Sequence, residues 1–157
     1  MLDIRRASRQ DALDTYAIRR QAILWQCTEA YDAALAQAWA DVPFTEGYAA
    51  LVAEHFYLAC MGDTLVATGM LDLDSGELGA LFVLPAFMGR GIARAMVEHL
   101  EGIARAEGLE AVNLDSTLNA AAFYRRCGYT GDALSVYQSP FGLELSCIPM
   151  RKVLVGV

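Results

Sequence analysis

Residues 83–97 read Val83-Leu-Pro-Ala-Phe-Met-Gly-Arg-Gly-Ile-Ala-Arg-Ala-Met-Val97, and this stretch predicts a strand end, a glycine loop and a helix start. The run Leu78–Leu84 is almost continuously apolar, which indicates a strand buried on both faces. Pro85 cannot donate to a sheet ladder, so it ends that strand. Gly89 and Gly91 allow positive φ and leave no Cβ in the way of a ligand.

A helical period begins at Ile92 and predicts an amphipathic helix to about Glu107. The apolar residues that share its face are Ile92, Met96, Val97, Leu100, Ile103 and Ala104. The loop therefore directs unpaired backbone N–H groups toward one point, at the positive end of the helix dipole. Such a point binds an anion, most naturally a phosphate or a pyrophosphate.

Two familiar phosphate loops do not fit this stretch. A P-loop requires a lysine directly after its last glycine, and neither Gly89 nor Gly91 is followed by one. A dinucleotide fingerprint requires a small residue at the position that Arg94 occupies. Nucleotide binding therefore stays only as a weak alternative.

Composition limits the classes of partner. The chain has 157 residues, and we expect one domain, 1–157. A net charge of −7 argues against a nucleic-acid partner and mildly favours a cationic or amine substrate. Four cysteines without C-x-x-C spacing predict reduced thiols and no metal site. Without a targeting or membrane-spanning segment, the expected location is cytoplasmic, away from membranes.

The rest of the chain shows helical and strand patterns in a mixed order. They predict a strand 2–7, helices 10–25, 32–39 and 45–54, strands 55–60, 65–73 and 78–84, a strand 109–114 parallel to 78–84, a short helix capped by Asn119 and closed by Gly128, and strands 136–138 and 143–150 with Pro149 at the end of the last one. Strands 55–60, 65–73 and 78–84 form an antiparallel meander, because only short turns join them.

The glycine loop resembles the acetyl-CoA loop of the GCN5-related N-acetyltransferases, whose signature is Gln/Arg-x-x-Gly-x-Gly/Ala. Gly91 and Ala93 match the last two fixed positions, whereas Met88 stands where Gln or Arg is expected and adds no side-chain hydrogen bond. The resemblance implies that the loop holds the pyrophosphate mainly through backbone N–H groups. The cofactor-binding residues that it implies are Val83, Met88, Gly89, Arg90, Gly91, Ile92 and Ala93.

A second motif, Asn119-x-x-x-Phe123-Tyr124-x-x-x-Gly128-Tyr129, resembles Asn-x-x-Ala-x-x-Phe-Tyr-x-x-x-Gly-Phe of the same family. The resemblance implies that Tyr124 is the general acid that protonates the leaving CoA thiolate. A tyrosine hydroxyl has a pKa of about 10, so it is protonated at neutral pH and can donate. Asn119 is expected to contact the pantetheine arm as well as to cap the helix.

The family resemblance also implies two groups on the central strand. The backbone N–H of Val83, near a β-bulge, is the expected donor to the thioester oxygen. Glu77 is the expected general base that deprotonates the attacking amine, because several family members carry a base there. Asp72, Asp74, Glu54 and His55 remain alternatives to Glu77.

A softer resemblance concerns Tyr31-Asp-Ala-Ala-Leu-Ala-Gln-Ala-Trp39, which is similar to a segment of little-characterised bacterial members. We expect Tyr31 and Trp39 to pack in a helical hairpin rather than to contact substrate.

The sequence therefore predicts an α/β (α+β) acetyltransferase fold, in which a mixed, mostly antiparallel sheet is flanked by helices and splayed in the middle. The implied function is transfer of an acetyl group from acetyl-CoA to a primary amine on a small molecule or a peptide. The alternative is a non-catalytic CoA-binding module, which the substitution at Met88 motivates. The resemblance is also compatible with a homodimer, because dimers are common in the family.

Overall fold

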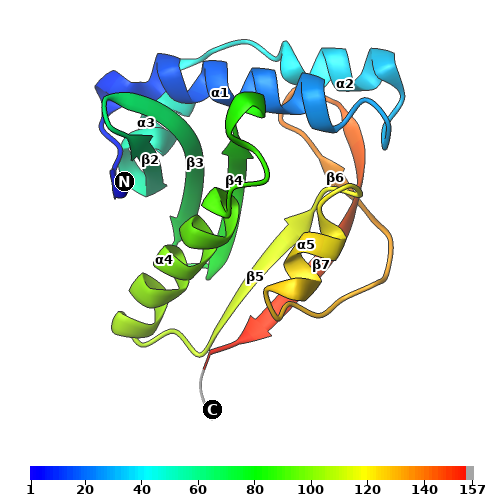
Figure 1. The fold of residues 1–157 in the computed structure, drawn as a ribbon. Coiled ribbons are helices and arrows are strands. Elements are labelled where there is room, and N and C mark those ends of the chain that lie inside the picture. The colour runs from blue at the N-terminus through cyan, green and yellow to red at the C-terminus, as the bar shows by residue number, and fades with distance from the viewer. Residues whose placement is uncertain (155–157) are drawn as a thin grey trace.

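The computed structural model describes residues 1–154 and contains a seven-stranded sheet in the order β1-β2-β3-β4-β5-β7-β6 (Figure 1). Every neighbouring pair is antiparallel except β4 and β5, which are parallel. The strands are β1 Leu2–Arg6, β2 Phe56–Met61, β3 Thr64–Asp72, β4 Glu77–Val83, β5 Ala111–Ser116, β6 Ser135–Gln138 and β7 Glu144–Val153. This mixed α/β architecture confirms the predicted fold class.

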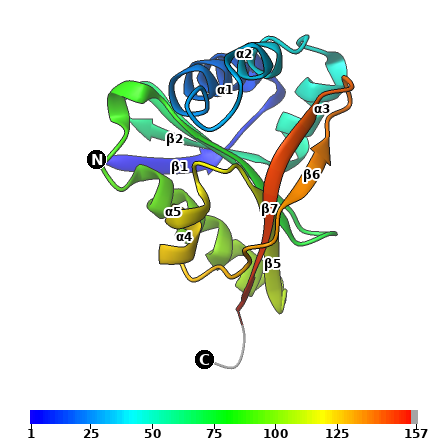
Figure 2. The same cartoon turned by 90° about the vertical axis from the view of Figure 1, so that its right-hand side faces the viewer.

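Helices cover both faces of the sheet. They are α1 Ala12–Gln26, α2 Ala33–Ala40, α3 Glu46–His55, α4 Ile92–Ala106 and α5 Ala121–Arg126, with short 3₁₀ turns η1 Arg9–Asp11 and η2 Pro85–Phe87. Figure 2 shows α1 and α2 on one side of the sheet and α4 and α5 on the other. Side chains alternate accordingly along β2, because Leu58 packs with Val52 of α3 whereas Ala59 belongs to the core beneath α4.

Local signals place the helix starts where the sequence predicts them. The Asp32 carboxylate accepts from the backbone N–H groups of Ala34 and Leu35, at 3.1 and 3.3 Å, and caps α2. Thr45 Oγ1 accepts from the N–H of Tyr48 at 3.0 Å and caps α3. These side chains satisfy N–H groups that have no partner within the helix, so they set the first residue of each helix.

β4 and β5 separate soon after they begin. Their only paired residues are Glu77 and Asn113, and beyond this point the two strands diverge (Figure 1). Opposite β3, the register of β4 shifts between the pairs Thr68–Phe82 and Met70–Gly79, so β4 holds one extra residue. Ala80 in this bulge has φ of 48°, and its carbonyl accepts from Thr68 Oγ1 at 2.6 Å. A β-bulge thus bends the central strand at the splay.

Four local predictions were wrong. Leu78–Leu84 is not buried on both faces, since only Leu78 and Val83 are buried within β4, and residues 79–82 face a cavity. The predicted strand 109–114 begins two residues later, as β5, because Leu109 still bonds back to Ala104 at the end of α4.

The helix after β5 also begins differently. Its N-cap is Ala120, without a side-chain bond, so Asn119 is not the cap. A turn that closes from the N–H of Ala120 to the carbonyl of Thr117 precedes it and leaves the Asn119 side chain exposed.

Pro149 lies inside β7 rather than at its end, opposite Asp115 of β5. The strand tolerates it because Arg151 exchanges backbone bonds with Thr130, on the side away from β5. Backbone groups alternate in direction along a strand, so the nitrogen of Pro149, two residues before Arg151, also faces away from β5. β6 has already ended on that side, so the N–H that proline lacks has no strand partner to bond.

Within residues 1–154, no helix combines the length and the apolar character needed to cross a bilayer. The four cysteines form no disulfide, and three of them are buried.

Candidate active site

The glycine loop joins β4 to α4 and presents unpaired backbone donors. Gly89 and Gly91 have φ of 77° and 80°, and a Cβ at either position would meet open space. The N-cap of α4 is Gly91, and its carbonyl accepts the first helical bond, from Ala95, at 3.0 Å. The N–H groups of Ile92, Ala93 and Arg94 therefore have no acceptor within the helix. This geometry is that of an anion site.

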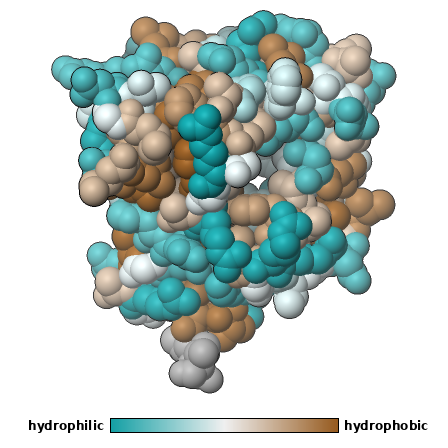
Figure 3. Space-filling model, viewed as in Figure 1, coloured by the Kyte–Doolittle hydropathy of each residue, from teal (hydrophilic) through white to brown (hydrophobic). Residues whose placement is uncertain are grey.

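A cavity of about 450 Å³ opens over this loop, and we call it the loop cavity. It lies where β4 and β5 diverge, and Figure 3 shows a hollow between the region of α4 and that of α5. Arg94 and Arg126 add positive charge to its wall, whereas the Arg90 side chain lies over the Phe87 ring, 5.1 Å from its centroid, and does not line it. The lining residues are Gln26, Leu81, Val83, Phe87, Met88, Gly89, Gly91, Ile92, Ala93, Arg94, Asn119, Ala120, Phe123, Tyr124 and Arg126.

The backbone of β4 turns two donors toward the splay. The N–H of Leu84 donates to Val66 of β3 at 2.8 Å, so the next pair, Ala67–Val83, is not hydrogen-bonded. Backbone groups alternate in direction along a strand, so the N–H groups of Val83 and Leu81 point away from β3, toward the gap. Both residues line the loop cavity, and within residues 1–154 β5 pairs with β4 only at Glu77, so two donors without a strand partner lie along its wall.

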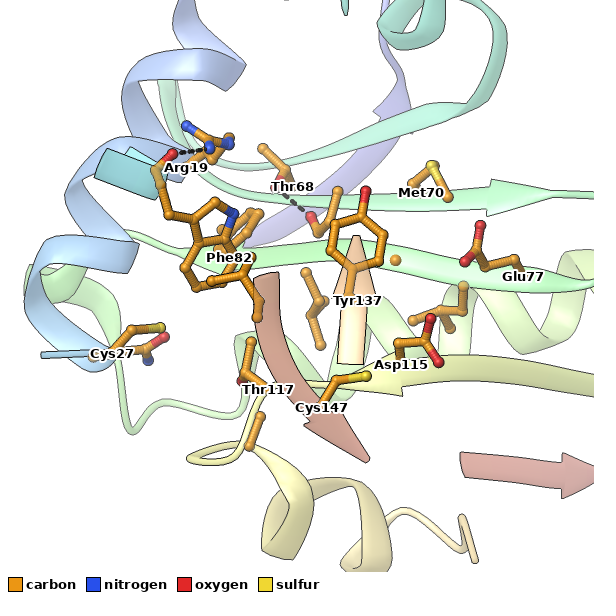
Figure 4. Close-up of a pocket in the computed structure, with 18 of the residues that line it drawn as sticks. Arg19, Cys27, Thr68, Met70, Glu77, Phe82, Asp115, Thr117, Tyr137 and Cys147 are labelled. Atoms are coloured by element: carbon orange, nitrogen blue, oxygen red, sulfur yellow. Dashed lines mark hydrogen bonds between the residues drawn. The ribbon is translucent and has the colours of Figure 1, made fainter. Parts of the chain in front are cut away.

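A second cavity, of about 440 Å³, lies between the N-terminal helices and the open end of the sheet, and we call it the sheet cavity. Aromatic side chains form much of its wall, namely Tyr31, Trp39, Tyr48, Phe56, Phe82, Tyr124 and Tyr137. In Figure 4, Glu77 and Asp115 lie together at one end, Arg19 and Cys27 lie at the other, and Tyr137 lies between them. A largely apolar pocket with a few charged groups is typical of a small-molecule site.

The two cavities meet. Five residues line both of them, and these are Gln26, Leu81, Asn119, Ala120 and Tyr124. A molecule bound over the glycine loop and a second molecule in the sheet cavity would therefore touch at the Tyr124 side chain.

Tyr124 is 7% exposed, and its ring packs edge-on against Tyr129, with centroids 5.8 Å apart. Its hydroxyl has no hydrogen-bond partner among residues 1–154. In that range every fully buried side-chain oxygen has a partner, so the Tyr124 hydroxyl is not fully buried. It therefore faces the cavities that Tyr124 lines. Burial raises the pKa of Tyr124 far above its ordinary value, and Cys127 adds to the rise. The hydroxyl therefore stays protonated over the whole neutral range.

Glu77 stands at the start of β4, at the acidic end of the sheet cavity. Burial raises the pKa of its carboxyl, and the neighbouring charges of Asp115 and Asp72 raise it further. No basic side chain forms an ion pair with any of these three carboxylates among residues 1–154. Of the other predicted bases, Asp72 and His55 line the same cavity, whereas Asp74 and Glu54 do not.

Tyr31 and Trp39 pack edge-on, with centroids 5.9 Å apart, as expected for a helical hairpin. Both also line the sheet cavity. The Tyr31 hydroxyl donates to the Ser146 carbonyl at 2.6 Å and accepts from the N–H of Leu118 at 3.1 Å. Tyr31 therefore links the N-terminal helices to β7 and to the turn before α5.

Sequence reasoning missed several lining residues. Asp115 directly follows the predicted strand 109–114, and a polar residue at a strand end was a signal that could have identified it. Gln26, Arg19 and Tyr137 carry no local signal, because they come from a helix end, a helix face and an edge strand that only the tertiary fold brings together.

Comparisons with known proteins agree with this geometry. The model of the acetyltransferase (GNAT) family matches residues 21–129. An IAA acetyltransferase of Azospirillum brasilense is 33% identical over 94 residues, which cover 55% of this chain and 58% of that relative. The match thus spans little more than half of the relative's length.

Solved structures share the fold over nearly the whole chain. A GCN5-related N-acetyltransferase of Rhodopseudomonas palustris superposes with a TM-score of 0.89 at 25% identity, covering 96% of this chain and 94% of that one. The PaiA N-acetyltransferase of Thermoplasma acidophilum, solved with coenzyme A, has a TM-score of 0.72 at 17% identity, covering 98% and 99% of the two chains. With the splayed sheet, the glycine loop and the family match, the chain belongs to the GNAT acetyltransferase family.

Proposed function

We propose that the protein is an N-acetyltransferase that transfers an acetyl group from acetyl-CoA directly to an amine acceptor. The observation that carries the proposal is the meeting of the two cavities at Tyr124. Direct transfer needs one site for a phosphate-bearing donor, a second for the acceptor, and a junction where the two reacting groups touch. That the relative in Thermoplasma acidophilum was solved with coenzyme A supports the identity of the donor.

Acetyl-CoA fits the loop cavity on electrostatic grounds. Its pyrophosphate would receive the free N–H groups at the start of α4, with Gly89 and Gly91 leaving room for close approach. Arg94 and Arg126 would add attraction for the phosphates. The backbone of Val83 would align the pantetheine arm along β4, and Asn119 lies beside it at the junction.

The thioester oxygen needs a donor as it gains negative charge. The N–H of Val83 points toward the gap, and so does the N–H of Leu81, which lies directly after Ala80 in the bulge. Because Leu81 lines both cavities and Val83 lines only the loop cavity, the Leu81 N–H is the better placed oxyanion donor. Val83 then serves mainly to hold the cofactor.

Tyr124 is proposed as the general acid. The amine attacks the thioester carbon, the C–S bond breaks, and the sulfur leaves with the electron pair. The raised pKa of Tyr124 keeps its hydroxyl protonated and ready to donate to that sulfur. Because a thiol is a stronger acid than this phenol, the hydrogen bond to the developing thiolate provides most of the stabilisation.

Glu77 is proposed as the base that removes a proton from the amine. It precedes Leu81 by four residues, or about 13 Å along a strand, so it acts through water rather than directly. Its raised pKa makes it a stronger base than an ordinary carboxylate. Asp115 shares that end of the cavity and is the competing candidate.

The test is turnover of acetyl-CoA with a panel of diamines, amino acids, arylalkylamines and short peptides. Release of free CoA thiol should require an acceptor, and mass spectrometry should find that acceptor one acetyl group heavier. A protein that binds acetyl-CoA but acetylates no member of a broad panel would instead support the non-catalytic module. Absence of CoA binding would contradict both functions.

A further inference from the structure

Gln26 is the last residue of α1, far in sequence from the glycine loop, yet its side chain reaches that loop. Its amide Nε2 donates to Met88 Sδ at 3.1 Å. Gln26 and Met88 both line the loop cavity, and Gln26 also belongs to the set shared with the sheet cavity. The Gln26 side chain is thus a polar group of α1 at the mouth of the site.

The hydrogen bond from the Gln26 amide to the Met88 sulfur is weak. A thioether sulfur is a weak acceptor, whereas carbonyl and phosphate oxygens are strong ones. Among residues 1–154, the Met88 sulfur is the only hydrogen-bond acceptor of the exposed Gln26 amide. An oxygen brought into the loop cavity by a ligand would compete for this donor on favourable terms.

We propose that Gln26 is a CoA-binding residue, whose amide donates to an oxygen of the bound cofactor and replaces the polar side chain that the loop lacks at Met88. This inference rests on the proposed function, because it assumes CoA in the loop cavity. The acceptor oxygen belongs to the pyrophosphate or to a pantetheine amide, and both offer the same chemistry.

The test measures CoA affinity by calorimetric titration in wild type and three variants. Gln26→Leu should bind CoA roughly 3- to 10-fold more weakly, as expected for one lost hydrogen bond. The matched control is Gln21→Leu, on the same helix but outside both cavities, and it should bind as wild type does. In the double variant Gln26→Leu/Met88→Gln, the amide returns from the loop itself, and affinity should recover.

The nucleotide half of CoA, without the pantetheine arm, separates the two oxygens. If Gln26→Leu weakens this fragment too, the acceptor is a phosphate oxygen; if it weakens only intact CoA, the acceptor is a pantetheine carbonyl. Three results would overturn the inference. Gln26→Leu could bind CoA as tightly as wild type, Gln21→Leu could weaken CoA binding as much as Gln26→Leu does, or the double variant could fail to recover affinity. If wild type itself binds no CoA, the proposed function falls with it, whereas normal wild-type binding with an unaffected Gln26→Leu removes this inference alone.

Discussion

Tyr124 and Tyr129 are both buried, but only the surroundings of Tyr124 suit a catalytic hydroxyl. The pKa of Tyr124 and that of Tyr129 are both raised, first by burial. The Tyr129 hydroxyl donates to the Glu101 carboxylate at 2.9 Å, whereas the Tyr124 hydroxyl opens onto both cavities. Only Tyr124 is therefore free to donate to a substrate.

Tyr124→Phe should lower kcat by about 10²-fold or more, the usual effect of losing a general acid, with little change in the KM for acetyl-CoA. Steady-state kinetics with the best acceptor measures this. Tyr57→Phe is the control, because Tyr57 is also buried but packs against His99 and Arg6, away from both cavities. An equal loss in both variants would contradict the role of Tyr124.

Glu77 should set the acidic limb of the pH profile of kcat/KM. Because its pKa is raised, activity should fall at a higher pH than an ordinary carboxylate would cause. Asp115→Asn removes a neighbouring negative charge, so the pKa of Glu77 falls and the limb moves to lower pH. Glu77→Gln should abolish the limb and most of the activity. If Glu77→Gln leaves the acidic limb of the kcat/KM profile unchanged, another carboxylate is the general base.

The raised pKa of Glu77 also has a consequence for stability. On raising the pH, the unfolded chain releases this proton first, so in the interval above the unfolded pKa the folded state binds more protons. Stability then falls as the pH rises through that interval. Glu77→Gln should therefore gain Tm relative to wild type at pH 7 but not below about pH 4, where both states are protonated. Thermal unfolding at the two pH values measures the difference, and a relative loss at pH 7 would contradict it.

At the scale of elements, a buried ionic cluster joins α4, the end of α5 and β7. Lys152 Nζ donates to Glu101 Oε1 at 3.1 Å and to the Cys127 carbonyl at 2.8 Å. Glu101 is 2% exposed and also accepts from Tyr129. Because Cys127 caps the helix that carries Tyr124, this cluster holds the proposed acid in place.

Lys152→Met should lower the free energy of unfolding by about 3 kcal/mol, because it leaves the buried Glu101 charge without its partner. This value is at the lower end of the range for broken buried ion pairs, since the Lys152 side chain is 24% exposed. Urea unfolding measures this loss. Adding Glu101→Gln should recover part of it, because no unpaired charge then stays buried. Arg20→Met breaks the exposed pair with Asp41 and should cost under about 1 kcal/mol. Similar losses in Arg20→Met and Lys152→Met would refute the cluster's special role.

At the scale of the molecule, the site depends on a sheet that fails to close. The loop cavity exists because β4 and β5 pair only at Glu77 and Asn113 and then separate. Ligand binding should therefore couple the half of the sheet under α4 to the half under α5. A ligand that fills this gap stabilises the folded state by mass action.

Acetyl-CoA and CoA, each at about 100 times its Kd, should add about 2.7 kcal/mol of stability. For a chain of this size the expected rise in Tm is roughly 5–11 °C, measured by thermal unfolding. NAD and ATP at equal concentrations should give no rise, since the loop has neither a P-loop lysine nor a dinucleotide fingerprint. A rise with NAD or ATP and none with CoA would contradict the assignment of the loop cavity to acetyl-CoA.

Local patterns were enough for most of the elements. Pro85, Gly89, Gly91 and the apolar period from Ile92 determine a strand end, a loop and a helix through the backbone of a few neighbouring residues. The family motifs pointed to the glycine loop and to Tyr124 because each motif has short, fixed spacings, and both line the loop cavity. The prediction of Asn119 as the cap was wrong, because a tight turn between Thr117 and Ala120 moved the helix start by one residue.

The sequence by itself therefore determined the order of elements, the fold family and the loop that is suited to bind a phosphate. Only the tertiary structure decided where β4 bulges, that Leu81 and Val83 face the gap, and that Gln26 and Asp115 join the site. The reason is physical: hydrogen bonds between near neighbours are encoded locally, whereas a cavity forms between elements that pack from distant parts of the chain.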